Sequence, residues 1–308
     1  MSRKSRIKLL HFLPEITYGV DAIAAAIAAE EPVFSVKGYD FSVTDPLTGE
    51  DIQLNYDDGE MGNKGFVLAG NHAKIGFKIY ATGAGNTATT VPVFDALLLA
   101  CLRKKTVSAN VVYSLDQTSV GSNTFYFHMD GTQHVLRGAR GSVKIGMTAK
   151  GLPYLEFTVM GLYVPPTAAL KLPTDFDGWL KPKPVGVEHT SCLFDGSPMK
   201  LISMEYDQGN KLVYEEYVGH QEILITDIEP KAKLVLEAPA LGVFDPFAGA
   251  LLEADHSFSI SHCASPQLFR WATDRLQMGR PKYGDRNGTI TYEIDVTPKG
   301  EADQIITG

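Results

Sequence analysis

The two halves of the chain carry similar short segments in the same order, and this repeat restricts the possible folds more than any other feature. The matches pair Leu54–Gly59 with Met204–Gly209, Lys74–Ala81 with Lys231–Ala238, and Pro92–Ala100 with Pro246–Ala254. Their offsets are 150, 157 and 154 residues, so only short loop changes separate the two series. Each half also closes on a strand-like segment that ends in proline, at Pro165 and Pro298. We therefore predict a duplication that gives two domains of one fold.

Most of the chain has the pattern of short β-strands. Ile75, Phe77 and Ile79 alternate with less apolar residues, and a period of two is typical of a strand. The 15 Phe, 13 Tyr and 29 Gly favour many short strands and turns over long helices. Further strands are expected at 109–115, 124–129, 133–136, 142–147 and 155–163, with a second series from 189 to about 298. The predicted fold class is mainly β (α+β), with antiparallel sheets.

Two apolar segments predict one short helix in each half. In the first, 91–102, Thr90 is a candidate cap and Pro92 suits the first turn. The second covers 246–254, and Asp245 can cap it. We expect the apolar side chains of both helices to pack against the sheets. These core residues are Phe94, Leu98, Phe247, Leu251 and Leu252.

Two stretches have the composition of a linker and a loop. Five prolines fall between Pro165 and Pro184, and we interpret 167–185 as a semi-rigid, extended linker. This linker would separate a first domain at 1–166 from a second domain at 186–308. The stretch 45–65 combines glycines with acidic residues and predicts a long loop, a feature that is usually functional or flexible in a compact domain.

Charge and cysteine content narrow the functional classes. The 308 residues carry a formal net charge of −8, which argues against gripping nucleic acid, because that needs cationic surface. Three cysteines lie far apart and indicate neither a disulfide framework nor a zinc site. The apolar stretch Leu9–Leu13 is too short for a signal peptide, and no window approaches the roughly 18 apolar residues of a membrane span. We expect neither export nor contact with a membrane.

No catalytic or metal-binding pattern stands out. Gly83 and Gly85 lie between a predicted strand and a predicted helix, but the third glycine of a dinucleotide fingerprint and the lysine of a P-loop are missing. His256 and His262 share one face of a predicted strand, where a metal would need further ligands. Neither a Gly-x-Ser-x-Gly elbow nor a His-Glu-x-x-His motif occurs. We expect no enzymatic activity, no cofactor and no metal.

Several segments resemble the major tail tube proteins of long-tailed (siphophage-type) bacteriophages. Glu15–Asp21 is similar to the opening of these proteins, and Val91–Ala100 is similar to their helix. The other similar segments are Tyr126–Gly131, Gly138–Ile145, Leu155–Gly161, Met204–Lys211 and Gly288–Ile294. The resemblance covers most of both halves. It implies two tandem tail tube domains, each an antiparallel β-sandwich or barrel with one flanking short helix.

The resemblance implies a structural virion protein that assembles with copies of itself into stacked rings. Such rings form the tail tube through which genomic DNA is ejected without specific binding, and an acidic lumen would repel phosphate. The family usually has one domain per chain and six domains per ring, so a duplicated chain implies a homotrimer in a pseudo-hexameric ring. The expected partners are the tape measure protein, the tail terminator and the baseplate or distal tail proteins. The protein would be made in the host bacterial cytoplasm and end in the virion tail.

We expect contacts between subunits or rings to come from the 45–65 loop, which would be mobile until assembly, and from its shorter, more rigid equivalent at 207–211. The candidate contact residues are Asp45, Asp57, Asp58, Glu60, Met61, Asp207, Asn210 and Lys211.

Two other functions remain open. One is a distal tail or baseplate hub protein of similar fold, and the other is a β-sandwich protein that binds carbohydrate or another ligand. A carbohydrate binder should expose aromatic side chains, and only two tryptophans, Trp179 and Trp271, are present. Tubes, single rings or monomers in electron microscopy would separate the three functions.

Overall fold

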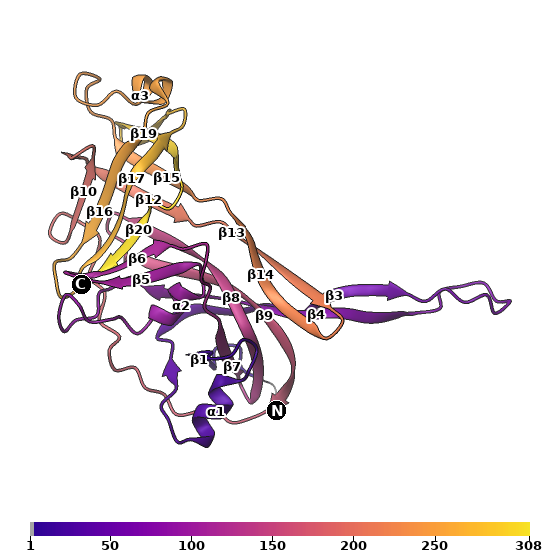
Figure 1. Cartoon of the computed structure of the whole chain (residues 1–308). Coiled ribbons are helices and arrows are strands. Elements are labelled where there is room, and N and C mark those ends of the chain that lie inside the picture. Colours follow the sequence, from indigo (N-terminus) through magenta and orange to yellow (C-terminus); the bar gives the residue numbers. More distant parts are fainter. Residues whose placement is uncertain (1–2) are drawn as a thin grey trace.

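The structure, a computed structural model, describes residues 3–308 and confirms a mainly β fold (Figure 1). The first half contains β1 (Lys8–Pro14), α1 (Ala22–Ala28), β2 (Phe34–Ser35), β3 (Gly38–Gln53), β4 (Phe66–Tyr80), α2 (Asp95–Leu99), β5 (Arg103–Val107), β6 (Val111–Leu115), β7 (Asn123–Met129), β8 (Thr132–Thr148) and β9 (Tyr154–Ala168). The second half contains β10 (Thr190–Phe194), β11 (Ser197–Pro198), β12 (Leu201–Asp207), β13 (Asn210–Tyr217), β14 (His220–Ile228), β15 (Lys231–Glu237), α3 (Pro246–Leu252), β16 (His256–His262), β17 (Phe269–Met278), β18 (Lys282–Arg286), β19 (Thr289–Pro298) and β20 (Gln304–Thr307).

The two halves share one antiparallel sheet of 18 strands, and the hairpin β13–β14 forms a separate sheet of two strands. Eight strands follow one another in the order β3–β4–β9–β8–β12–β15–β19–β18. Among residues 3–308, strands of the two halves pair at two places, where β8 pairs with β12 and where the C-terminal strand β20 pairs with β6. The second half is therefore joined to the first by hydrogen-bonded strands.

The core is continuous across this junction. Alternate residues of β4, such as Ile75, Phe77 and Ile79, are buried, as expected for a strand with one face on the core. They belong to the same buried cluster as Met204 and Leu234 of the second half. Burying apolar surface from both halves in one core stabilises their relative position.

The strand pairings of the first half recur in the second. Pairs β1–β7, β7–β8, β4–β9 and β3–β4 correspond to β10–β16, β16–β17, β15–β19 and β12–β15. The matches at Lys74–Ala81 and Pro92–Ala100 fall on equivalent elements, β4 with β15 and α2 with α3. The match of Leu54–Gly59 with Met204–Gly209 is wrong as a structural equivalence, because the first lies at a hairpin tip and the second in β12 and the following turn.

Residues 45–53 of the predicted loop 45–65 are strand, whereas 54–65 are not. β3 continues to Gln53 and β4 begins at Phe66, so the two strands form a long hairpin that projects from the body (Figure 1). Pro46 and Gly49 are accommodated because the register shifts at bulges between Asp45 and Thr48 and beyond. We call residues 46–70 the arm; only its tip, 54–65, lacks strand structure.

The segment 167–185 is not an extended spacer. Trp179 is buried and its Nε1 donates to the Ser35 carbonyl at 2.9 Å. Val185 is also buried, and its backbone exchanges hydrogen bonds of 2.8 Å with Lys150 and Gly151. The prediction of an extended linker at 167–185 is therefore wrong, because the segment packs along the first half.

The helices are shorter than predicted. Residue 94, not Thr90, occupies the N-cap of α2, and no side chain caps this helix. Asp245 caps α3 as predicted, since its side chain accepts from the backbone of residues 247 and 248 at 3.0 Å. The predicted burial of Phe94 and Leu98 is confirmed.

At α3 the predicted core residues are wrong in part. Phe247 is half-buried against Tyr292, with ring centroids 6.0 Å apart. Leu251 and Leu252 are 85% and 73% exposed. The helix lies at the far end of the second half (Figure 1) and packs through Pro246 and Gly249, so its leucines face outward.

The two helices should respond differently to the same truncation. Leu98→Ala should lower the free energy of unfolding by roughly 2–5 kcal/mol, because it leaves a cavity in the core. Leu252→Ala should change it by less than about 0.5 kcal/mol, because the side chain is exposed. Urea unfolding of both variants measures the difference, and equal losses would contradict these helix orientations.

Acid should weaken the fold through a buried histidine. His128 is 4% exposed, its ring nitrogens have no hydrogen-bond partner, and His11 lies 5.7 Å away ring to ring. Burial, and then the neighbouring His11, lower the pKa of His128 from 6.5 to about 4. The unfolded chain therefore takes up a proton that the folded chain excludes, so the stability from this group is complete above pH 6.5 and is lost as the pH falls toward about 4.

Replacing this histidine tests the assignment. Between about pH 7 and pH 4.5, the melting temperature of His128→Phe should fall less than that of the parent protein. An equal loss in both proteins would mean that carboxylates alone cause the acid sensitivity.

Candidate self-association surface

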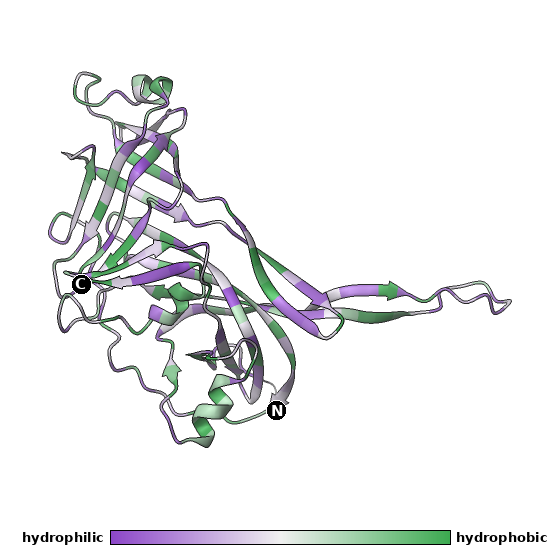
Figure 2. Cartoon of the chain, in the orientation of Figure 1, coloured by the Kyte–Doolittle hydropathy of each residue, from purple (hydrophilic) through white to green (hydrophobic). Residues whose placement is uncertain are grey.

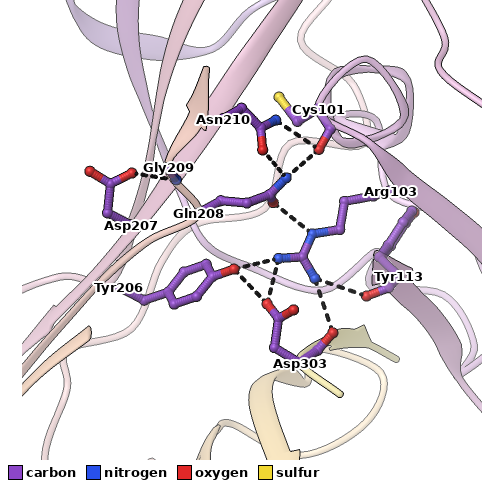
Figure 3. Close-up of polar contacts among 9 residues, drawn as sticks. All are labelled: Cys101, Arg103, Tyr113, Tyr206, Asp207, Gln208, Gly209, Asn210 and Asp303. Atoms are coloured by element: carbon purple, nitrogen blue, oxygen red, sulfur yellow. Dashed lines mark hydrogen bonds and ion pairs between the residues drawn. The ribbon is translucent and has the colours of Figure 1, made fainter. Parts of the chain in front are cut away.

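A buried ion pair joins the two halves where β5, β12 and the C-terminal segment meet (Figure 3). Arg103 Nη2 lies 2.6 Å from Asp303 Oδ2, and both side chains are fully buried. The same nitrogen donates to the Tyr206 hydroxyl at 2.8 Å, and Arg103 Nε donates to Gln208 Oε1 at 2.8 Å. The guanidinium from the first half is therefore bound by three side chains of the second. Such pairing is what allows two charges to be buried together.

Each ionisable side chain discussed for this network keeps one charge state around neutral pH. Burial lowers the pKa of Arg103, but Asp303 and then Tyr206 more than offset this effect, so the pKa lies above its ordinary value. Burial raises the pKa of Tyr206 well above its ordinary value, and its hydroxyl donates to Asp303 Oδ2 at 2.5 Å. Burial also raises the pKa of Cys101 to about 12. The arginine stays cationic and the tyrosine and thiol stay neutral, so the network suits a structural role.

Two predicted contact residues belong to this junction. Asn210 Nδ2 donates to the carbonyls of Gly141 at 2.8 Å and Cys101 at 3.2 Å. Asp207 Oδ2 lies 2.8 Å from Lys144 Nζ, across the β8–β12 pairing. These residues therefore connect the halves within one chain, whereas the neighbouring Lys211 is exposed.

The hairpin β13–β14 also packs on the first half. The Ile223 N–H donates to the Tyr18 hydroxyl at 2.6 Å, and Arg140 Nη1 donates to the Ile223 carbonyl at 2.5 Å. The guanidinium of Arg140 lies 4.7 Å from the Tyr18 ring centroid, and Tyr214 stacks on His72 at 5.1 Å. From the sequence alone, Arg140 is a loop charge, exposed to solvent or paired with another subunit. In the structure Arg140 is instead half-buried beneath a hairpin from distant sequence.

The segment Glu15–Asp21 has a structural role at this contact. The Glu15 carboxylate accepts from the Gly138 N–H at 2.7 Å and from the Thr124 hydroxyl at 2.8 Å. Gly138 has a φ of +56°, and a Cβ there would lie 2.6 Å from the Tyr18 ring. Glycine at this position therefore lets Tyr18 lie beneath β14.

The arm carries apolar side chains that this chain leaves exposed. Figure 2 shows apolar stretches on both of its strands. Ile52, Phe66, Val67 and Leu68 are each at least 50% exposed, and Met61 at the tip is 103% exposed. Exposed apolar side chains on a long hairpin favour pairing with another surface.

The other predicted contact residues lie on or beside the arm. Asp57, Asp58, Glu60 and Met61 are at the tip, and Asp45 lies in β3 at the base. Asp58 pairs with Lys64 at 2.6 Å, and this hydrogen bond, followed by one from the Glu60 backbone, lowers its pKa. The Asp58 carboxylate therefore stays charged at neutral pH and stabilises the turn at the tip.

A groove of about 680 Å³ follows the junction on the polar face of the sheet. It contains both signs of charge, from Lys144, Glu156, Glu205, Asp207, Lys231 and Lys233. Several of these charges are paired, such as Lys233 with Glu293 at 2.9 Å. The face is thus charge-balanced and does not present a basic track.

Within residues 3–308 no group of three or more His, Cys, Asp or Glu side chains is placed to hold a metal ion. None of the helices described in that range has the length and apolar character needed to cross a membrane. Comparison with protein-family models and with curated proteins finds no match for the chain.

The buried ion pair should behave as a unit. Arg103→Met should lower the free energy of unfolding by roughly 3–5 kcal/mol, because it leaves Asp303 buried and unpaired. Adding Asp303→Asn should recover part of that loss, since the uncompensated charge is removed. A double-mutant cycle from denaturant unfolding measures the coupling, and strictly additive losses would contradict a coupled pair.

Proposed function

We propose that this chain is a structural virion protein, the tail tube subunit of a long-tailed bacteriophage, which assembles with copies of itself into stacked rings. The observation that carries this proposal is the projecting arm, whose apolar residues such as Phe66 and Leu68 are exposed in the single chain. A second support is the repeated strand order, which gives the chain two similar units for ring formation. The resemblance of Glu15–Asp21 and the later segments to tail tube proteins points to the same function.

The two surfaces suggest different roles in the tube. The arm has the length and apolar character to reach a neighbouring ring, where its tip carboxylates would face a partner. The polar sheet face suits a DNA channel, because paired lysines such as Lys144 and Lys233 leave few free cations to hold phosphate. In this proposal the tape measure protein, tail terminator and baseplate or distal tail proteins are further partners, and the assembled protein resides in the tail.

The two alternatives differ in their support. A hub protein of similar fold would also use the arm and the sheet, so only the form of the assembly separates it from a tube protein. The carbohydrate-binding function has little structural support. Trp179 is 9% exposed and Trp271 is fully buried, so neither indole is free to stack on a sugar.

Electron microscopy of the purified protein tests the proposal. We expect tubes of stacked rings, whose formation should be lost in Phe66→Ser/Leu68→Ser, because these side chains would be covered on assembly. Val187→Ser is the control, since Val187 is 104% exposed but lies outside the arm. Both variants should melt near the parent temperature.

Single closed rings would favour the hub function instead. Monomers at all concentrations tested would contradict self-assembly altogether.

A further inference from the structure

The repeat makes specific positions in the two halves equivalent. Lys78 lies opposite Glu156 in the β4–β9 pairing, and Val235 lies opposite Glu293 in β15–β19. Glu156 and Glu293 are therefore equivalent. On the other side of its strand, each lies opposite a lysine: Glu156 opposite Lys144 in β8, and Glu293 opposite Lys282 in β18. The end of β8 thus corresponds to β18, and Gly146 corresponds in the same way to Gly284.

The same reasoning relates β12 to β3. Asp207 lies opposite Lys231 in β12–β15, and Asp45 lies opposite Lys74 in β3–β4. Since Lys74 and Lys231 begin the matched segments of β4 and β15, Asp45 is the equivalent of Asp207.

Within the chain, β8 of the first half and β12 of the second half, the counterparts of β18 and β3, form a hydrogen-bonded strand pair. β12 pairs with the end of β8, so that Asp207 lies opposite Lys144 and Tyr206 opposite Ile145. Lys144 Nζ and Asp207 Oδ2 are 2.8 Å apart. This pairing makes the two halves one sheet.

The remaining equivalents, β3 and β18, are the two ends of the eight-strand run. Within residues 3–308, β3 pairs with β4 alone and β18 with β19 alone. Tyr283 on β18 is 64% exposed, and Val43 on β3 is only half-buried, whereas their counterparts Ile145 and Tyr206 are each 1% exposed. Asp45 has only a loose contact with Lys74, at 3.6 Å. Both edges therefore lack the neighbour that their counterparts have.

We propose that β18 of one copy pairs antiparallel with β3 of a second copy, in the register that β8 and β12 use within the chain. Lys282 then lies opposite the partner's Asp45 and Tyr283 opposite its Val43. The two edges complement each other in charge, and the contact continues an interface that the chain already contains. The Phe41 carbonyl accepts from Lys8 Nζ at 2.6 Å, so the pairing covers Ser42 to Asp45 and not the bulge before it. The register of β3 against β4 also shifts between Val43 and Asp45, so Thr44 is skipped on this edge too, and Asp45 and Val43 face successive residues of β18.

One chain cannot make this contact with itself, because the β8–β12 pairing fixes β3 and β18 at opposite ends of the run. The contact is head to tail, so it closes into a ring or continues as a filament. The proposal rests on the proposed function in that it requires self-assembly, and it adds the surfaces and the register.

Disulfide cross-linking of the assembled protein tests the pairing. Directly opposed residues of antiparallel strands have Cα atoms about 4.5–5.5 Å apart, within the range that a disulfide spans. Asp45→Cys/Lys282→Cys, in a Cys263→Ser background, should cross-link into a ladder of covalent oligomers on oxidation. An equal mixture of the two single variants should stop at the covalent dimer, because each chain then carries one cysteine of the pair.

Two matched controls fix the geometry and the register. Lys144→Cys/Asp207→Cys, the equivalent pair inside the chain, should form an intramolecular disulfide with no increase in mass. Asp45→Cys/Arg286→Cys should not cross-link, because Arg286 is four residues, about 13 Å, farther along the strand.

The outcomes separate this proposal from the proposed function. Rings or tubes that form, with the intramolecular control closing but no link between residues 45 and 282, would overturn the pairing and leave the function intact. Covalent dimers from either single variant alone would indicate a symmetric contact and would also overturn it. Absence of any assembly would overturn both.

Discussion

The buried Arg103–Asp303 pair is the interaction on which the relation of the two halves depends. A buried guanidinium without a partner would be strongly destabilising, so the C-terminal segment and β12 can close over β5 only with Asp303 and Tyr206 placed to bind it. This constraint places β20 against β6 and β12 against β8, and so extends one sheet through the whole chain. The polar network thereby lies at the junction where the apolar surfaces of the two halves form one core.

The continuous sheet has two open edges, and the arm is exposed beside it. Within residues 3–308, its two end strands, β3 and β18, each pair with a strand on one side only, and the arm exposes apolar side chains on both of its strands. Natural proteins usually protect such edges, because open edges promote association. In the proposed assembly, the edges act within one layer and the arm acts between layers.

Local features of the structure could be predicted from the sequence. Alternation in β4, the Asp245 cap and the apolar face of α2 follow from residues close together in the chain, and the structure agrees with them. The arm was missed because Pro46 and Gly49 indicate a loop unless bulges absorb them, and bulges depend on the partner strand.

Long-range polar contacts could not be predicted. Arg103 follows a helix and precedes two lysines, which gives it the pattern of a surface charge, yet its partners lie 200 and 103 residues away. The burial of Trp179 in a proline-rich stretch and the exposure of Leu252 on an apolar helix are set by which elements pack beside them. Neither is encoded in local periodicity.

In the proposed assembly, the two halves are equivalent units, and their contact within the chain is repeated between chains. The rotational symmetry of a single ring, determined by electron cryomicroscopy together with its native mass, tests this claim most directly. We expect three chains per ring and a pseudo-sixfold density in which first and second halves alternate. Six chains per ring, with the second half outside the ring wall, would contradict it.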